Sequence, residues 1–189
     1  MDALQLLIAD HNRVRGLFKR FEAAEGENEA QAAKLAATIF EELEVHTKIE
    51  EEIFYPTITK LSDEIHDLVT EGLEEHHVVD NLMEEAKALT PMDEEWAAKI
   101  KVLIENVEHH ADEEEEELFP KVRSAMNDGA RSELGQRLEA RKAEMGAPTA
   151  ADKESLSTEE LKRLASEQEI PGRSSMDREE LLATVAPQS

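Results

Sequence analysis

The amino-acid sequence predicts an all-α protein: an antiparallel up-and-down four-helix bundle with a short fifth helix and a small C-terminal helix-loop-helix module. Two observations support this fold class. Apolar residues recur at alternating spacings of three and four, and helix-breaking segments at 26–29, 60–63, 90–93 and 127–129 separate these stretches. Because the breaks are short, consecutive helices are expected to be antiparallel neighbours.

The composition supports helices and limits the possible partners. Aromatic residues make up 4 % of the chain, so its apolar surface comes mainly from Leu, Ile, Val, Met and Ala, which favour helices over sheets. The 21 Lys and Arg residues against 45 Asp and Glu residues give a net charge of −24. Such a negative field repels nucleic acid and anionic membranes and attracts cations.

The lack of a long apolar segment and the lack of cysteine limit the expected location of the protein and its metal ligands. The chain has no basic N-terminal leader and no apolar run of about 18 residues, which predicts a soluble, cytoplasmic protein that makes no membrane contact. It also has no cysteine, which excludes disulfides and thiolate ligands. Any transition metal would therefore be held by imidazole and carboxylate groups.

Local signals place the element boundaries. At the third break, Thr90 is expected to cap a helix that begins with Pro91, with Asp93 near its positive end. The Gly-Ala-Pro-Thr stretch that starts at Gly146 ends the bundle. The predicted organisation is a helix-bundle domain, a linker and a small helical module, over residues 1–146, 147–154 and 155–189.

An internal repeat relates the two halves of the bundle. The segment HTKIEEEIFYP from His46 recurs as HADEEEEELFP from His110, at an offset of 64 residues. Upstream, HNRVRGLF from His11 aligns with HHVVDNLM from His76. Each half thus reads His, then His-x-x-x-Glu. The proline that ends each copy removes a backbone donor, so both helices are expected to bend or loosen just past the candidate ligands.

Helical phase separates inward-facing candidates from exposed histidines. Each of the four long helices has one histidine in its apolar stripe, and in the second and fourth helices the glutamate four residues later shares that stripe. The rest of each acidic run is expected to face solvent, and His66, His77 and His109 fall outside the stripes. The inward-facing candidates are His11, His46, Glu50, His76, His110 and Glu114.

These six buried polar groups predict a metal site. An unpartnered buried polar group costs about 1 to 3 kcal/mol and a buried charge far more, whereas a divalent or trivalent cation would satisfy all six. The His-x-x-x-Glu spacing puts both groups on one helix face, so a carboxylate can bridge two ions. In so acidic a chain this spacing arises by chance about one time in four, so the repeat and the shared phase support the site. A metal-free bundle, or zinc or manganese as the metal, are the alternatives.

The pattern resembles the hemerythrin-like (HHE cation-binding) family, whose members have His, His-x-x-x-Glu, His, His-x-x-x-Glu in a four-helix bundle. The resemblance covers about residues 1–125, including IADHNRVRGLF, EEHHVV and the FYP and LFP ends. It implies two non-haem iron ions in a centre of the Fe-O-Fe type, bridged by Glu50 and Glu114. Oxygen-carrying hemerythrins typically have a further histidine four residues after the third, where this chain has Asp80.

This departure bears on the predicted function. A centre with fewer histidines keeps open positions, which favours reaction with dioxygen, hydrogen peroxide or nitric oxide over simple carriage. Catalase-like peroxide decomposition is preferred. The alternative is a protein that binds or senses oxygen, iron or redox state without turnover and signals through the C-terminal module. A ferritin-like di-iron bundle would need Glu-x-x-His on two helices, and only Glu74 to His77 fits.

Three further residues are candidates for positions beside the centre. The repeat places Arg15 in the spot equivalent to Asp80, so an Arg15–Asp80 ion pair, buried or half-buried, is favoured over Asp80 as an additional ligand. Tyr55 aligns with Phe119 and is expected to pack in the core, with contact to the metal site as the alternative.

The C-terminal segment predicts a separate small module. Residues 155–186 show a capping box at Ser157 and Glu160, two short amphipathic helices and a turn at IPGRSSM. This resembles SAP-like or Rho N-terminal modules, which often bind nucleic acid. Its four basic residues against seven acidic ones do not form a basic footprint, so a protein partner is expected rather than nucleic acid. Weak nucleic-acid binding or a plain structural appendage are the alternatives.

Overall fold

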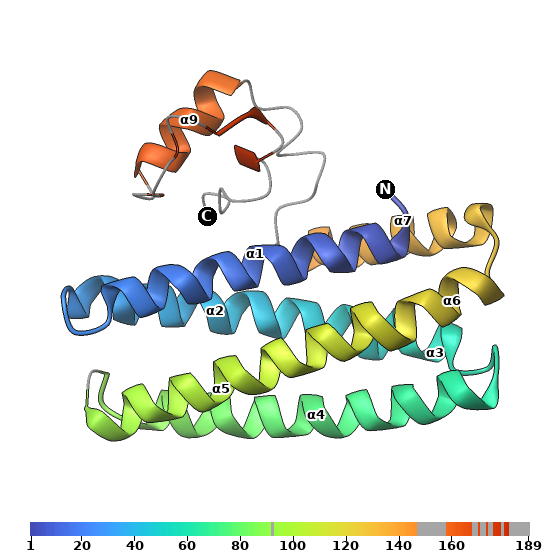
Figure 1. The fold of residues 1–189 in the computed structure, drawn as a ribbon, viewed down its shortest axis with the longest axis horizontal. Coiled ribbons are helices and arrows are strands. Elements are labelled where there is room, and N and C mark those ends of the chain that lie inside the picture. Colours follow the sequence, from blue (N-terminus) through green and yellow to red (C-terminus); the bar gives the residue numbers. More distant parts are fainter. Residues whose placement is uncertain are drawn as a thin grey trace.

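The computed structural model describes residues 1–91, 93–146, 158–167, 170, 173, 176–178, 180 and 181. Four long helices lie side by side and antiparallel (Figure 1), which confirms the predicted fold class. They are α1 (Ala3–Ala24), α2 (Glu29–Ile49), α4 (Asp63–Ala88) and α5 (Glu94–Glu113). Among the described residues, no helix is both long enough and apolar enough to span a membrane.

Both proline-containing helices loosen as predicted, and the irregularity is a π-helical turn. One π-turn begins at Glu50 and the other at Glu114, and each ends just before the short helix that contains the proline. Because proline cannot donate to the carbonyl one turn earlier, the turn before it widens. The segments are η1 (Glu50–Phe54) with α3 (Tyr55–Ile58), and η2 (Glu114–Leu118) with α6 (Phe119–Ala125).

The start of α5 differs from the prediction. The helix begins at Glu94 with Asp93 as the N-cap residue, so Thr90 does not cap it and Pro91 is not its first residue. The Asp93 N–H instead donates to the Thr90 carbonyl at 3.2 Å, closing a turn before the helix. Glu94 and Glu95 then place two negative charges in the first turn, where they stabilise the positive end of the helix.

Two apolar clusters fill the bundle and leave a polar layer between them. One includes Phe18, Ile39, Met83 and Ile100, toward the α1–α2 and α4–α5 loops. The other includes Leu4, Ile49, Ile65 and Phe119, toward the opposite end. Along each long helix the inward histidine falls between these clusters, so the candidate ligands are shielded from water on both sides.

The shorter fifth helix, α7 (Asp128–Glu144), packs along α1, α2 and η1 (Figure 1). Its approach depends on Gly135, since a Cβ atom there would lie only 2.7 Å from the Met1 carbonyl oxygen and 2.9 Å from the Ala3 nitrogen. Arg131 of α7 also donates to Asp2, the N-cap residue of α1, at 3.2 Å. The fifth helix is therefore joined to the start of the first.

The Asp2–Arg131 contact predicts a pH-dependent contribution to stability. Although burial opposes it, hydrogen bonds from Gln5 and Arg131 lower the pKa of Asp2. A carboxyl group whose pKa is lowered on folding stabilises the protein above its unfolded pKa of about 3.9, and this contribution disappears as the pH falls. Asp2→Asn keeps a capping side chain, so it should lower the free energy of unfolding near about pH 6 and have little effect near about pH 3.

Urea unfolding of metal-free protein at both pH values checks this result. Asp128→Asn is the matched control, because Asp128 also pairs with Arg131 but its side chain is 97 % exposed. An Asp2→Asn effect of equal size at both pH values would mean that the charge contact with Arg131 contributes nothing.

In the C-terminal part, the structure describes α9 (Thr158–Glu167) and a small apolar cluster of Leu161, Ala165, Ile170 and Leu181. This agrees with a helix in the predicted module. The predicted linker, residues 147–154, lies outside the described residues, as do Ser157 of the predicted capping box and most of the IPGRSSM turn. The division into three parts stays a prediction.

Candidate metal centre

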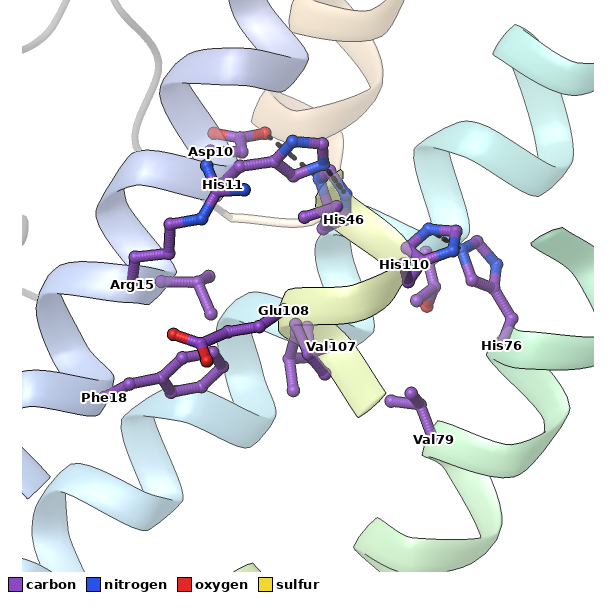
Figure 2. Close-up of a pocket in the computed structure, with 14 residues that line it drawn as sticks. Asp10, His11, Arg15, Phe18, His46, His76, Val79, Val107, Glu108 and His110 are labelled. Carbon is purple, nitrogen blue, oxygen red and sulfur yellow. Dashed lines mark hydrogen bonds and ion pairs between the residues drawn. The ribbon is translucent and has the colours of Figure 1, made fainter. Parts of the chain in front are cut away.

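The six residues selected from the sequence come together in the middle of the bundle. The histidines come from four different helices and their rings converge, as Figure 2 shows. All six side chains belong to residues that are at most 6 % exposed. The three other histidines, His66, His77 and His109, are exposed as predicted. Helical phase therefore sorted the seven histidines correctly.

The histidines form two pairs, one in each half of the repeat. The Nε2 atoms of His11 and His46 lie 3.1 Å apart, and those of His76 and His110 are also separated by 3.1 Å. All four Nε2 atoms thus meet in the polar layer. Two facing imidazole nitrogens at this distance can both bind one cation.

Each glutamate reaches one histidine of each pair. Glu50 Oε2 lies 3.2 Å from His46 Nε2 and 3.3 Å from His76 Nε2. Glu114 Oε2 lies 3.4 Å from His11 Nε2 and 3.9 Å from His110 Nε2. The donor atoms form two groups that share Glu50. This arrangement fits two neighbouring cations joined by carboxylates.

Three of the four carboxylate oxygens of these two glutamates lack a hydrogen-bond partner among the described residues. Neither oxygen of Glu50 accepts a hydrogen bond from the described residues, nor does Oε2 of Glu114, although all three atoms are buried. Burial, together with the adjacent Glu114 carboxylate, raises the pKa of Glu50 well above its usual range. Two carboxylates that cannot both stay ionised without a cation are a strong indication of a metal site.

The imidazoles differ in their electrostatic surroundings. Although burial opposes it, the Glu114 and Glu115 carboxylates beside the ring raise the pKa of His11 to about 10. Burial lowers the pKa of His46 to about 4, against the opposing effect of Asp10. Because a metal ligand must be a neutral imidazole, a cation would have to displace the proton on His11 but none on His46.

Each of the four buried histidines also has a carboxylate beside Nδ1, the ring nitrogen that does not face the centre. The Nδ1 atom donates to Glu115 from His11 at 2.9 Å, to Glu51 from His76 at 3.0 Å and to Glu75 from His110 at 2.6 Å. For His46 the neighbour is Asp10, at 3.7 Å. Such carboxylates hold the ring so that Nε2 presents its lone pair to a metal.

Sequence reasoning missed these four carboxylates and assigned the acidic runs, apart from the bridging glutamates, to solvent. A signal was present in the repeat. An acidic residue follows each bridging glutamate (Glu51 and Glu115), and another precedes the first histidine of each half (Asp10 and Glu75). Glu51 and Glu115 each lie beside a histidine of the opposite half of the repeat. Asp10 and Glu75 each lie beside a histidine of their own half.

Asp10 differs from the other three carboxylates because a buried lysine binds it. Lys142 of α7 donates to both Asp10 oxygens at 2.5 Å, and both residues are almost fully buried. Although burial opposes it, the Lys142 charge holds the pKa of Asp10 well below its usual range. The fifth helix therefore contacts the group that lies beside His46.

Tyr55 both packs in the core and reaches the site. Its hydroxyl donates to Glu114 Oε1 at 3.0 Å, and its ring stacks on His76 with the centroids 5.5 Å apart. Burial, and then the Glu114 carboxylate, raise the pKa of Tyr55, so the hydroxyl keeps its proton. Phe119, at the equivalent position of the repeat, stacks on His11 but has no hydroxyl. The two halves of the centre are therefore chemically different.

The predicted Arg15–Asp80 pair is wrong. Arg15 donates to Asp112 and to Glu115, each at 2.7 Å, and Asp80 is exposed and outside the donor groups. Residues at equivalent positions of a repeat occupy corresponding places in the two halves and need not face each other. Arg15 on α1 faces the neighbouring α5, while Asp80 points to solvent from α4.

A small cavity of about 20 Å³ borders the four histidines. Phe18, Val79 and Val107 are among the apolar residues that line its other side, where Arg15 and Glu108 also lie (Figure 2). The space fits a molecule of the size of water or a little larger. A second pocket, of about 10 Å³, reaches His110 and Glu114 from the α4–α5 side.

Comparisons with known proteins agree with this geometry. The Hemerythrin HHE cation binding domain family matches residues 2–122. A crystal structure of a hemerythrin HHE cation binding domain-containing protein from Mycobacterium kansasii has the same fold, with a TM-score of 0.67 and 23 % sequence identity over 77 % of this chain and 87 % of that chain. A DNA nickase from Nostoc sp. is 26 % identical over 127 residues, which make up 67 % of this chain and 35 % of the nickase. The chain thus spans about a third of that relative.

Proposed function

Because the chain belongs to the hemerythrin HHE cation-binding family, we propose that the polar layer holds two non-haem iron ions and decomposes hydrogen peroxide. The observation that supports this most strongly is Glu50, whose two buried oxygens lack a hydrogen-bond partner among the described residues and lie between two histidine pairs. The proposed ligands are His11, His46, Glu50, His76, His110 and Glu114.

The residues present fit iron. The donors are imidazole nitrogens and carboxylate oxygens, and a shared carboxylate between two nitrogen-rich groups suits iron or manganese. When bound, an iron pair supplies the change of oxidation state that converts two molecules of hydrogen peroxide into one dioxygen and two waters. Dioxygen and nitric oxide are small enough to reach the same cavity.

The chain's own residues prepare the site for small ligands. The carboxylates at Nδ1 orient the imidazoles, and the apolar wall of the cavity limits the entry of water. The Tyr55 hydroxyl holds one Glu114 oxygen, which leaves the other oxygen of Glu114 directed at His11 and His110. Asp80 lies outside the two buried donor groups, and no other side chain of the described residues takes the place of the missing histidine there.

Oxygen release from peroxide tests the proposal. Iron-loaded protein should evolve dioxygen rapidly, and His46→Ala and His110→Ala should fall to the rate of the buffer because each removes one nitrogen of a pair. His77→Ala is the matched control, since His77 is exposed on the same bundle. Iron-loaded protein that leaves peroxide unchanged would contradict the catalytic part of the proposal.

A sensing or binding function without turnover is the second candidate. The observation that favours it is the helix α9 after the bundle, with a buried apolar cluster of its own, because a separate helical unit can bind a protein partner. If sensing is the function, proteolytic cleavage in residues 147–189 should change when iron is added. The ferritin-like alternative is not supported, because Glu74 and His77 are both exposed. DNA nicking is not proposed, because a net charge of −24 repels DNA.

A further inference from the structure

The fifth helix makes the two halves of the bundle different. On the first half, α7 packs over α1, α2 and η1. On the second half, the repeat-equivalent positions on α4 and α5 are acidic or histidine and reach solvent. In each pair of equivalent positions, the first residue belongs to the first half and the second residue to the second half: Leu6 and Glu71, Asp10 and Glu75, Val45 and His109, and Ile49 and Glu113. Of the bundle helices that the structure describes, none covers the α4–α5 side as α7 covers the other (Figure 1).

A pocket on this α4–α5 side leads to the buried centre. Its outer lining includes Glu71, Glu75 and Glu113, and its inner lining includes His110 and Glu114. Glu114 is 4 % exposed, and its Oε2 atom accepts no hydrogen bond from the described residues. The pocket therefore joins a negatively charged surface to a carboxylate of the centre that has one oxygen without a hydrogen-bond partner among the described residues.

Gly72 leaves the pocket open. A Cβ atom at this position would lie 3.0 Å from the Tyr55 hydroxyl and 3.5 Å from His110 Cε1. Any larger side chain would therefore fill the space between the surface and these two groups. Gly72 is buried on α4, so a side chain at this position would close the opening.

Three side chains beside this pocket, two of which line it, can hold a cation. His109 Nε2 lies 3.4 Å from Glu113 Oε1 and 3.8 Å from Glu75 Oε1. Donor atoms of all three residues lie within 4.8 Å of one another. The other oxygen of Glu75 accepts from His110 Nδ1 at 2.6 Å, so this outer group touches a proposed ligand of the centre.

We propose that Glu75, His109 and Glu113 form a transient binding site for a divalent transition-metal cation, and that cations reach the buried centre past Gly72 on the α4–α5 side. The inference rests on the proposed metal centre. The acidic surface concentrates cations, one imidazole and two carboxylates replace part of their water shell, and Glu114 receives them inside. On the α1–α2 side, Lys142 neutralises Asp10 beneath α7, so the carboxylate at that position attracts a cation less strongly.

The rate of Co²⁺ uptake by metal-free protein tests this route. The double variant His109→Ala/Glu113→Gln removes the outer donors and keeps Glu75, which positions His110. Its uptake should slow on the order of tenfold or more, with the same final Co²⁺ content, because charged residues at an opening raise association rates by about 10 to 10³. Extraction of bound Co²⁺ by a chelator should slow as well, since both directions use one route.

The control is His77→Ala/Glu74→Gln, which removes the same residue types from an exposed pair on α4, with Nδ1 and Oε2 3.7 Å apart. It should take up Co²⁺ at the wild-type rate. Uptake by the His109/Glu113 variant at the wild-type rate, or an equal slowing of both double variants, would overturn the route while the buried centre still fills. Wild-type protein that binds no Co²⁺ would instead contradict the proposed metal centre, and the route with it.

Discussion

Glu50→Gln should abolish tight metal binding while leaving the metal-free protein as stable as the wild type. Glu50 is 0 % exposed, and it is the only residue shared by the two buried donor groups that the described residues form. Without a cation, burial and the Glu114 carboxylate raise the pKa of Glu50 and favour its neutral form. A neutral amide of the same shape should therefore change the free energy of unfolding by less than about 1 kcal/mol.

Two measurements check this result. Metal analysis after iron loading should find iron in the wild type and almost none in the variant. Thermal unfolding should show that added iron stabilises only the wild type, by about 4 kcal/mol when free metal exceeds its dissociation constant by about 1,000-fold. For a chain of this size that corresponds to a rise in Tm of roughly 10 °C.

Glu117→Gln is the matched control for Glu50→Gln, because Glu117 also follows a histidine in an acidic run but is exposed on η2. It should bind iron like the wild type. If Glu50→Gln retained the full iron content, or if it unfolded the metal-free protein, Glu50 would be a structural residue and not the shared ligand.

Lys142→Met should destabilise the metal-free protein by about 3 to 5 kcal/mol near neutral pH. Methionine keeps the length of the apolar stem but leaves the Asp10 charge buried without its cation partner, the situation in which breaking a buried pair costs this much. The Lys142 charge lowers the pKa of Asp10, so the pair stabilises the protein above the unfolded pKa of about 3.9. The difference between variant and wild type should therefore shrink as the pH falls.

Urea unfolding of the two proteins measures this difference. The double variant Asp10→Asn/Lys142→Met removes the buried charge as well, so it should recover much of the lost stability. Arg141→Met is the control on the same helix, since its pair with Glu52 lies at the surface and contributes little. A Lys142→Met protein as stable as the wild type would show that the pair does not fasten α7 to the bundle.

Much of the centre could be predicted from the sequence because helical periodicity is a local property. A period of 3.6 residues determines which side chains share a buried face, whatever the neighbouring helix is. The repeat then pairs the two halves, so His11 and His76, and His46 and His110, were assigned alike. The prolines that follow Glu50 and Glu114 likewise predicted the loosened turns. A proline has no backbone N–H, so it removes a hydrogen bond within its own helix, whatever that helix packs against.

What periodicity cannot determine is which residues of separate helices face each other. Arg15 was aligned correctly in the repeat yet paired wrongly, because alignment relates corresponding positions and contact depends on helix order in space. Tyr55 and Phe119 occupy equivalent positions, and only the structure shows that the Tyr55 hydroxyl reaches a bridging glutamate.

Spacing along single helices is enough to predict four amphipathic helices, the inward histidine of each and the two glutamates one turn further on. Three other features appear only when the helices are packed: carboxylates from other helices hold the imidazoles, Lys142 neutralises Asp10, and α7 covers one side of the centre and leaves the acidic side open. These features depend on contacts between segments up to 132 residues apart, which no local pattern encodes.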